Sequence, residues 1–219
     1  MRKLLIVGMV AMLSIASTTS FADDGNFFVN GDVGQAHYRV ASSSTYDFFY
    51  GSYHDSVDKK DTAGALRFGY RWHSVVDYGV EAGYVDLGQT KTKTYSPYGT
   101  DYDRKEDQKT RGWLVGGNLK YNIADKWYVS ARGGWFRSRN EVEAQGSNAP
   151  LLPGFFHYSI SSTGTGEYLG LGAGYNILPN LSVGLSYDNY HARTNSSSNI
   201  AIADSTNIAL YSVSAEYRF

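Results

Sequence analysis

Four charged residues are the strongest candidates for chemistry in this sequence. Glu81, Lys120 and Arg132 fall in three consecutive segments of alternating polar and apolar residues, and Arg67 falls at a comparable depth in the preceding segment. A carboxylate near an amine and two guanidinium groups forms ion pairs, and burying either sign of charge without a partner is costly. Two interpretations stay open: the four residues form a satisfied polar core, or they line a path for ions.

Two other patterns suggest chemistry less strongly. Residues 170–174 resemble a nucleotide-binding glycine loop, but they lie within a predicted strand and no helix follows. His191, Ser196 and Glu216 could supply the groups of a lipid-modifying enzyme, yet Glu216 falls near the opposite rim. No pair of histidines has zinc-ligand spacing, and the absence of cysteine excludes thiol catalysis. We therefore predict no enzymatic activity, no cofactor and no metal.

The elements that position these residues are strands. Alternation of period two predicts eight of them, joined alternately by short turns and long polar connections. The strands are expected at about 26–38, 63–73, 78–87, 112–122, 127–137, 167–176, 181–190 and 208–219. The long connections are expected at about 40–62, 88–111, 138–166 and 191–207.

The two faces of these strands differ in charge. One face is uncharged and carries all four tryptophans, whereas the other face carries Asp32, Arg67, Arg71, Glu81, Lys120, Arg132, Asp188, Glu216 and Arg218. A water-soluble barrel would invert this pattern, and a cation on a lipid face costs about 2–4 kcal/mol at the midplane. The sequence therefore predicts an all-β fold, an eight-stranded antiparallel up-and-down transmembrane β-barrel with its charges in the lumen.

Aromatic residues near the strand ends predict two interfacial girdles. Trp72, Tyr78, Tyr121, Trp127 and Phe219 mark the short-turn end, and Tyr84, Trp113, Trp135 and Tyr211 mark the other end.

The amino terminus predicts export. Arg2 and Lys3 precede an apolar run, and small residues at Ser20 and Ala22 form a cleavage site, so residues 1–22 are predicted to be a signal peptide. Residues 23–219 would then be one barrel domain in the outer membrane of a Gram-negative cell. The near-neutral charge provides no basic stripe, so no nucleic-acid partner is expected.

The segments TAGALRFGYRW, LVGGNLKYNIADKWYVSARGGW and LGLGAGYNILPNLSVGLSYDNY, with the final SAEYRF, resemble the amino-terminal transmembrane domain of OmpA and other small eight-stranded outer-membrane proteins. The resemblance implies that Glu81, Lys120 and Arg132 belong to an interior charge network proposed to act as a gate. Gly174 and Gly184 stand where that network has an acidic and a basic residue. The thinned network would leave either a wider water path or a different plug.

The resemblance also implies partners. Tyr217, Arg218 and Phe219 resemble the signal read by the barrel-assembly machinery, and the wall would contact outer-membrane lipid and lipopolysaccharide. Because the sequence stops at Phe219, the periplasmic peptidoglycan-binding domain of OmpA is not expected.

The expected function is an integral outer-membrane β-barrel protein that supports envelope structure, with weak ion or small-solute permeability left open. The alternative is a surface adhesin or receptor that binds a host surface or phage through its long loops, where aromatic clusters occur at 46–50 and 151–156. Against this alternative, the strands could simply continue above the membrane, with these aromatics packed on each other. A lipid A-modifying enzyme is a distant third.

Overall fold

The computed structural model describes residues 25–39, 46–47, 51–52, 54–95, 103–148, 154–193 and 205–219. The predicted signal peptide, residues 1–22, lies outside the described residues, as do the side chains of the aromatic clusters at 46–50 and 151–156.

No helix in the described ranges is long and apolar enough to cross a membrane.

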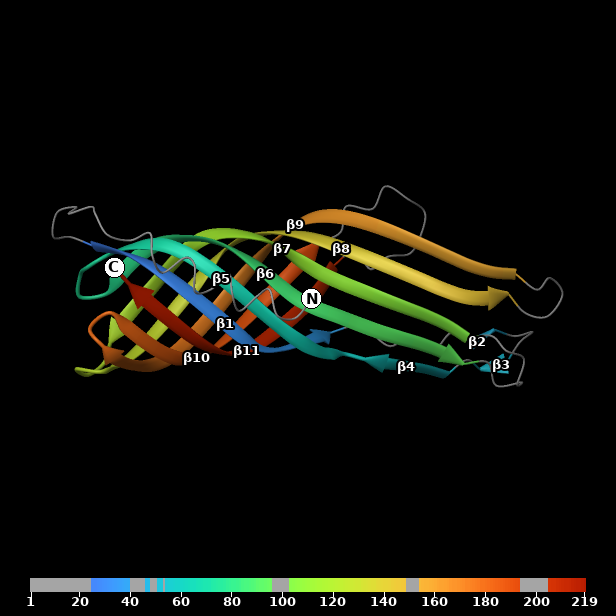
Figure 1. The fold of residues 1–219 in the computed structure, drawn as a ribbon, viewed down its shortest axis with the longest axis horizontal. Coiled ribbons are helices and arrows are strands. Elements are labelled where there is room, and N and C mark those ends of the chain that lie inside the picture. The colour runs from blue at the N-terminus through green and yellow to red at the C-terminus, as the bar shows by residue number, and fades with distance from the viewer. Residues whose placement is uncertain are drawn as a thin grey trace.

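The described chain forms a closed antiparallel barrel of eight strands, as predicted (Figure 1). Each barrel strand pairs with its neighbours in chain order, and the pairings of β1 with β11 and of β6 with β7 complete the circle. The barrel strands are β1 (Gly25–Arg39), β5 (Lys60–Trp72), β6 (Asp77–Tyr95), β7 (Asp103–Asn122), β8 (Trp127–Asn148), β9 (Gly154–Leu178), β10 (Leu181–Arg193) and β11 (Ser205–Arg218). Three short strands accompany them: β2 (Tyr46–Asp47), β3 (Gly51–Ser52) and β4 (His54–Asp58).

The outer wall is the uncharged face, as the alternation predicted. Its large apolar side chains are exposed on the isolated barrel, with Trp135 71% and Trp113 65% accessible. Cross-strand neighbours on this face are aromatic near the rims: Tyr84 lies edge-on against Trp113, and Trp127 lies edge-on against Tyr175. An apolar wall of this extent is costly in water and favourable in lipid, because it replaces apolar contact with water by contact with acyl chains.

Strands β6 to β9 are longer than predicted. They have 19, 20, 22 and 25 residues, and the connections expected at 88–111 and 138–166 are largely strand. Together with β4 they continue beyond the barrel as a sheet extension, visible at one end of Figure 1. The prediction stopped early because it followed the apolar outer face, which ends at the girdle although backbone pairing continues. A bulge between Asp86 and Gln89 interrupts the register, and Gly88 there adopts a φ of 73°.

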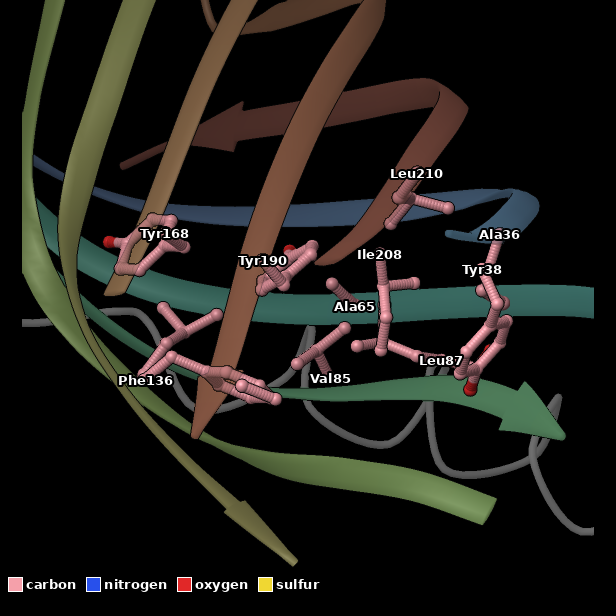
Figure 2. Packing of buried hydrophobic residues seen from close by; sticks show 13 residues of the cluster. Ala36, Tyr38, Ala65, Val85, Leu87, Phe136, Tyr168, Tyr190, Ile208 and Leu210 are labelled. Atoms are coloured by element: carbon pink, nitrogen blue, oxygen red, sulfur yellow. The ribbon is translucent and has the colours of Figure 1, made fainter. Parts of the chain in front are cut away.

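The polarity of the strands inverts at the aromatic girdle farther from the short turns, here called the upper girdle. Below the girdle, apolar side chains point outward and charged ones inward. Above it, polar side chains point outward. Apolar side chains fill the interior there (Figure 2). This apolar cluster comprises Ala36, Tyr38, Ala63, Ala65, Val85, Leu87, Leu114, Phe136, Tyr168, Tyr190, Ala192, Ile208 and Leu210. The reversal follows the surroundings of the wall, which change from lipid to water.

Candidate functional site: the charged lumen

The lumen below the apolar cluster holds two groups of charged side chains. The first, here called the arginine cluster, comprises Asp32, Arg67, Glu81, Arg132 and Asp188. The second, called the Glu216 cluster, comprises Arg71, Lys120 and Glu216. All eight side chains come from lumen-facing positions of the barrel strands, so closure of the sheet brings together residues that are far apart in sequence.

Arg67 is the centre of the arginine cluster. Its side chain is fully buried and forms a salt bridge with Asp32, and Nη2 lies 3.6 Å from Oδ2 of Asp188. Nε lies 3.7 Å from Oε1 of Glu81, and Nη2 donates to the Tyr190 hydroxyl at 2.7 Å. Three carboxylates therefore surround a single guanidinium.

Arg132 supplies the second cation of the arginine cluster. Its Nε and Nη2 donate to the two oxygens of Asp188 at 2.7 and 2.6 Å, in a bidentate arrangement. The Tyr168 hydroxyl donates to Glu81 at 2.8 Å, and Ser186 donates to Asp32 at 3.3 Å. Charge-assisted bonds of this kind are the stronger ones in proteins, and they fix both partners.

The Glu216 cluster lies closer to the short turns. Arg71 donates from Nη1 and Nη2 to the two oxygens of Glu216 at 2.8 and 3.0 Å, and Lys120 donates to the same carboxylate at 2.9 Å. Lys120 also donates to Ser182 at 3.1 Å, and its Nζ lies 4.0 Å from the centre of the Tyr128 ring. One carboxylate thus serves two cations. An aromatic face supports each of them, since the Arg71 guanidinium lies 4.4 Å from the centre of the Phe28 ring.

The four residues proposed from sequence divide between the two clusters. Arg67, Glu81 and Arg132 lie in the arginine cluster, whereas Lys120 pairs with Glu216 and forms no ion pair with Glu81. The partners omitted from that proposal were Asp32, Arg71, Asp188 and Glu216. Their lumen-facing alternation was visible in the sequence, but alternation does not say which strands meet across the lumen.

Tyr128 explains the two glycines at expected network positions. A Cβ atom at Gly174 would lie 2.5 Å from the Tyr128 hydroxyl oxygen, and one at Gly184 would lie 2.7 Å from it. The ring therefore occupies the space that larger side chains at 174 and 184 would need.

A small cavity lies in the charged lumen. A cavity of about 30 Å³ lies between the clusters, lined by Arg71, Glu81, Lys120, Tyr128, Arg132 and Glu216 among others. Such a polar cavity has room for about one water molecule. With the apolar cluster above it, the described lumen is packed with side chains. The arrangement can fix the eight strands relative to one another and keep the lumen closed.

Residues proposed for other roles lie elsewhere. His191 pairs with Asn207 at 2.7 Å, Glu216 is held by Arg71 and Lys120, and Ser196 lies outside the described residues. The described ranges contain no group of His, Asp and Glu side chains that could hold a metal ion. At the carboxy terminus, the Phe219 amide donates to the Phe27 carbonyl at 3.0 Å, and its ring packs edge-on against Tyr217. Arg218 donates to Asn176 at 3.3 Å.

Comparisons with known proteins agree with this architecture. The model of the outer membrane protein beta-barrel domain family matches residues 7–219. The crystal structure of Ail, the attachment invasion locus protein of Yersinia pestis, in complex with the heparin analogue sucrose octasulfate is similar at 16% identity and a TM-score of 0.50. That similarity covers 90% of this chain and 100% of Ail.

The outer membrane protein OprG from Pseudomonas aeruginosa is similar at 14% identity and a TM-score of 0.50. This comparison covers 90% of this chain and 96% of OprG. No curated protein matches at a significant level by sequence. At these identities the structural likeness concerns the fold alone.

Proposed function

The chain belongs to the outer membrane protein β-barrel family, and from this premise we propose that it is a non-enzymatic integral protein of the outer membrane. Its role would be to support the structure of the envelope as a rigid barrel with a closed lumen. The single observation that carries this proposal is the filling of the lumen by the two charged clusters and the apolar cluster above them. A lumen that is packed along its length favours a structural role over transport.

Planar-bilayer conductance of the refolded residues 23–219 tests the closed lumen. Folding is first verified by the difference in gel mobility between heated and unheated samples. We expect no discrete conductance steps for the parent protein, because ion-paired side chains and the apolar cluster fill the described lumen. Glu81→Gln and Lys120→Gln are measured beside it. Steps in the parent that either change alters would instead make the lumen a gated pore.

The envelope role has its own test in cells. A strain without the gene is expected to leak periplasmic protein and to become sensitive to detergent, and the parent gene should restore both properties. A gene lacking residues 148–156 should restore them equally well, because the deletion removes only the tip between β8 and β9. A deletion strain with an intact barrier would contradict the role in envelope structure.

A second candidate function is favoured by the sheet extension. Strands β6 to β9 extend beyond the girdle as a sheet with a polar outer face, and surface-exposed segments on a stable scaffold often carry binding functions. In this case the chain would be a surface adhesin or receptor for a host surface or phage. Deleting residues 148–156 should then abolish cell binding while assembly continues. Unchanged binding would exclude the β8–β9 tip as the contact.

The non-enzymatic part of the proposal is supported by Glu216. This carboxylate accepts hydrogen bonds from Arg71 and Lys120 and is therefore not available as the acid of a triad with His191. Mass analysis of lipid A from a strain lacking the gene should show no change. A shift by one acyl chain would contradict the proposal.

We further propose that Tyr217, Arg218 and Phe219 form the signal for the barrel-assembly machinery. Phe219 as a residue is 40% exposed beside β1, so it is accessible at the seam that closes the barrel. Phe219→Ala should slow assembly in cells but leave refolding in detergent nearly unchanged. Equal slowing in both settings would point to stability alone.

A further inference from the structure

Four cations gather on the outer wall at the upper girdle and directly above it. We call Lys109, Arg111, Arg137 and Arg139 the interfacial cation patch. Arg137 lies opposite Trp113 in the register of β7 and β8, Arg111 lies opposite Arg139, and Lys109 lies opposite Glu141. All four face outward, where the wall changes from apolar to polar. The patch therefore begins at the level where the girdle ends.

The level of the patch follows from strand geometry. Aromatic girdles mark the membrane–water interface, and Trp113 and Trp135 belong to the outer one. Arg139 is one outward-facing position above Arg137, about 7 Å along the strand. With a strand tilt of about 45°, that is about 5 Å in height. The guanidinium groups therefore lie in the headgroup layer of the outer leaflet.

Two of the four cations, Arg137 and Lys109, form no ion pair with the neighbouring carboxylates of the described chain. Glu141 accepts from Arg111 at 2.6 Å, and its Oε1 also lies 3.1 Å from Nε of Arg139, so one charge serves two cations. The other acidic residues nearby are Asp86, opposite Arg111, and Glu167, opposite Trp135. Asp107 and Glu143 lie opposite each other, one outward position beyond Lys109 and Glu141. In the described part of the chain, Arg137 and Lys109 form no salt bridge with any of these carboxylates. The patch retains cationic groups that can receive an anion.

We propose that Arg137 and Arg139 bind a phosphate group carried by a lipid of the outer leaflet. Arginine presents two parallel N–H donors that match two phosphate oxygens, and it is weakly hydrated compared with lysine. Trp113 lies opposite Arg137 and Trp135 lies one outward position below it, where both rings would contact the acyl chains of the same lipid. This inference rests on the outer-membrane location of the barrel and is independent of whether the lumen is closed.

The test uses the refolded barrel in phosphatidylcholine nanodiscs that contain a small fraction of diphosphorylated lipid A. Native mass spectrometry measures the lipid A that stays bound, and the same lipid without its phosphates serves as the comparison. The parent should retain the phosphorylated form preferentially. Arg137→Gln with Arg139→Gln should weaken retention about tenfold or more, because charge-assisted hydrogen bonds are lost. Arg111 remains in this variant to pair with Glu141.

The matched control removes two cations from the same sheet face farther from the membrane. Lys91 and Lys93 face outward on β6, where Lys91 lies opposite Asp107. Lys91→Gln with Lys93→Gln should leave retention unchanged. Equal losses in the two double variants, or equal retention of both lipid forms by the parent, would overturn the proposal.

Two further measurements keep the result interpretable. Arg137→Lys with Arg139→Lys keeps the charge but loses the paired donors, so retention should fall between the parent and the glutamine variant. Retention equal to the parent would show that charge alone suffices and would overturn the bidentate assignment. Inorganic phosphate at the same concentration should leave Trp fluorescence unchanged in lipid-free detergent. A saturating response would assign the patch to a free anion instead of a lipid.

Discussion

Glu216 forms ion pairs with two buried cations, because its single carboxylate contacts both Arg71 and Lys120. Glu216 is 7% exposed, and the side chains of Arg71 and Lys120 are similarly buried. When one partner of a buried ion pair is removed, the loss of stability depends mainly on the charge that stays buried without a partner. A buried cation that loses its partner destabilises the fold far more than a surface pair does.

We expect Glu216→Gln to lower the free energy of unfolding by about 3 kcal/mol, because two buried cations would share a neutral amide. Urea unfolding in phosphatidylcholine vesicles measures the change. Glu143→Gln is the matched control, since Glu143 is exposed on the outer face of β8, and it should shift stability by less than about 0.5 kcal/mol. Comparable losses in the two variants would argue against the Glu216 cluster as a stabilising unit.

Gly174, a lumen-facing glycine, allows a second prediction about the stability of the barrel. Gly174→Ala should destabilise the barrel by about 1–3 kcal/mol, because the new methyl group meets the Tyr128 ring and the Val183 carbonyl. Gly117, on the outer face of β7, is the control. A Cβ atom there would have no neighbour closer than 3.4 Å, so Gly117→Ala should be nearly neutral. The same urea titration compares them. A neutral Gly174→Ala would show that Tyr128 moves freely.

Among the elements, β9 contains both halves of the polarity inversion. Its outward residues are leucines at Leu169 and Leu171 and then hydroxyl residues from Thr165 to Ser159. The strand is continuous through this change, because backbone pairing with β8 continues from Tyr175 to Gly154. Only the polarity of the outward side chains changes at the position where the wall leaves the lipid.

Arginine substitutions on the outer face of β9 should therefore differ by position. Leu171→Arg places a cation at mid-wall and should cost about 2–4 kcal/mol, whereas Ser161→Arg above the girdle should cost less than about 0.5 kcal/mol. Unfolding in vesicles measures each variant. If Ser161→Arg is as costly as Leu171→Arg, the membrane boundary lies farther along the extension than the girdle indicates.

For the whole molecule, the decisive contact is the seam between the first and last barrel strands. β1 pairs with β11 from Phe28 opposite Arg218 to Arg39 opposite Asn207. This pairing closes the sheet, so the part of the wall that β1 and β11 span has no free strand edge. A sheet that spans a membrane must be closed in this way, because lipid cannot satisfy the backbone groups of an open edge. The pairing also brings Glu216 on β11 into the lumen, where this residue completes the Glu216 cluster.

The seam can be trapped covalently, because the chain contains no cysteine of its own. Val33→Cys with Val213→Cys places two thiols at directly opposed positions, and they should form a disulfide on mild oxidation of the folded barrel. Gel mobility without reductant reports the crosslink. Val33→Cys with Tyr217→Cys, four positions out of register, is the control and should remain open. Crosslinking only in the control would indicate a shifted seam.

The alternation of side chains was enough to predict the barrel, its strand number and its two faces. Period-two patterning is a local property, and lipid outside a barrel makes the outer face uniformly apolar. Sequence also placed Arg67, Glu81, Lys120 and Arg132 in the lumen. Only the closed structure decided that Lys120 pairs with Glu216, that Tyr128 fills the space left by two glycines, and that an apolar cluster lies above the charges. Those outcomes depend on which strands face one another across the lumen, and no single strand carries that information.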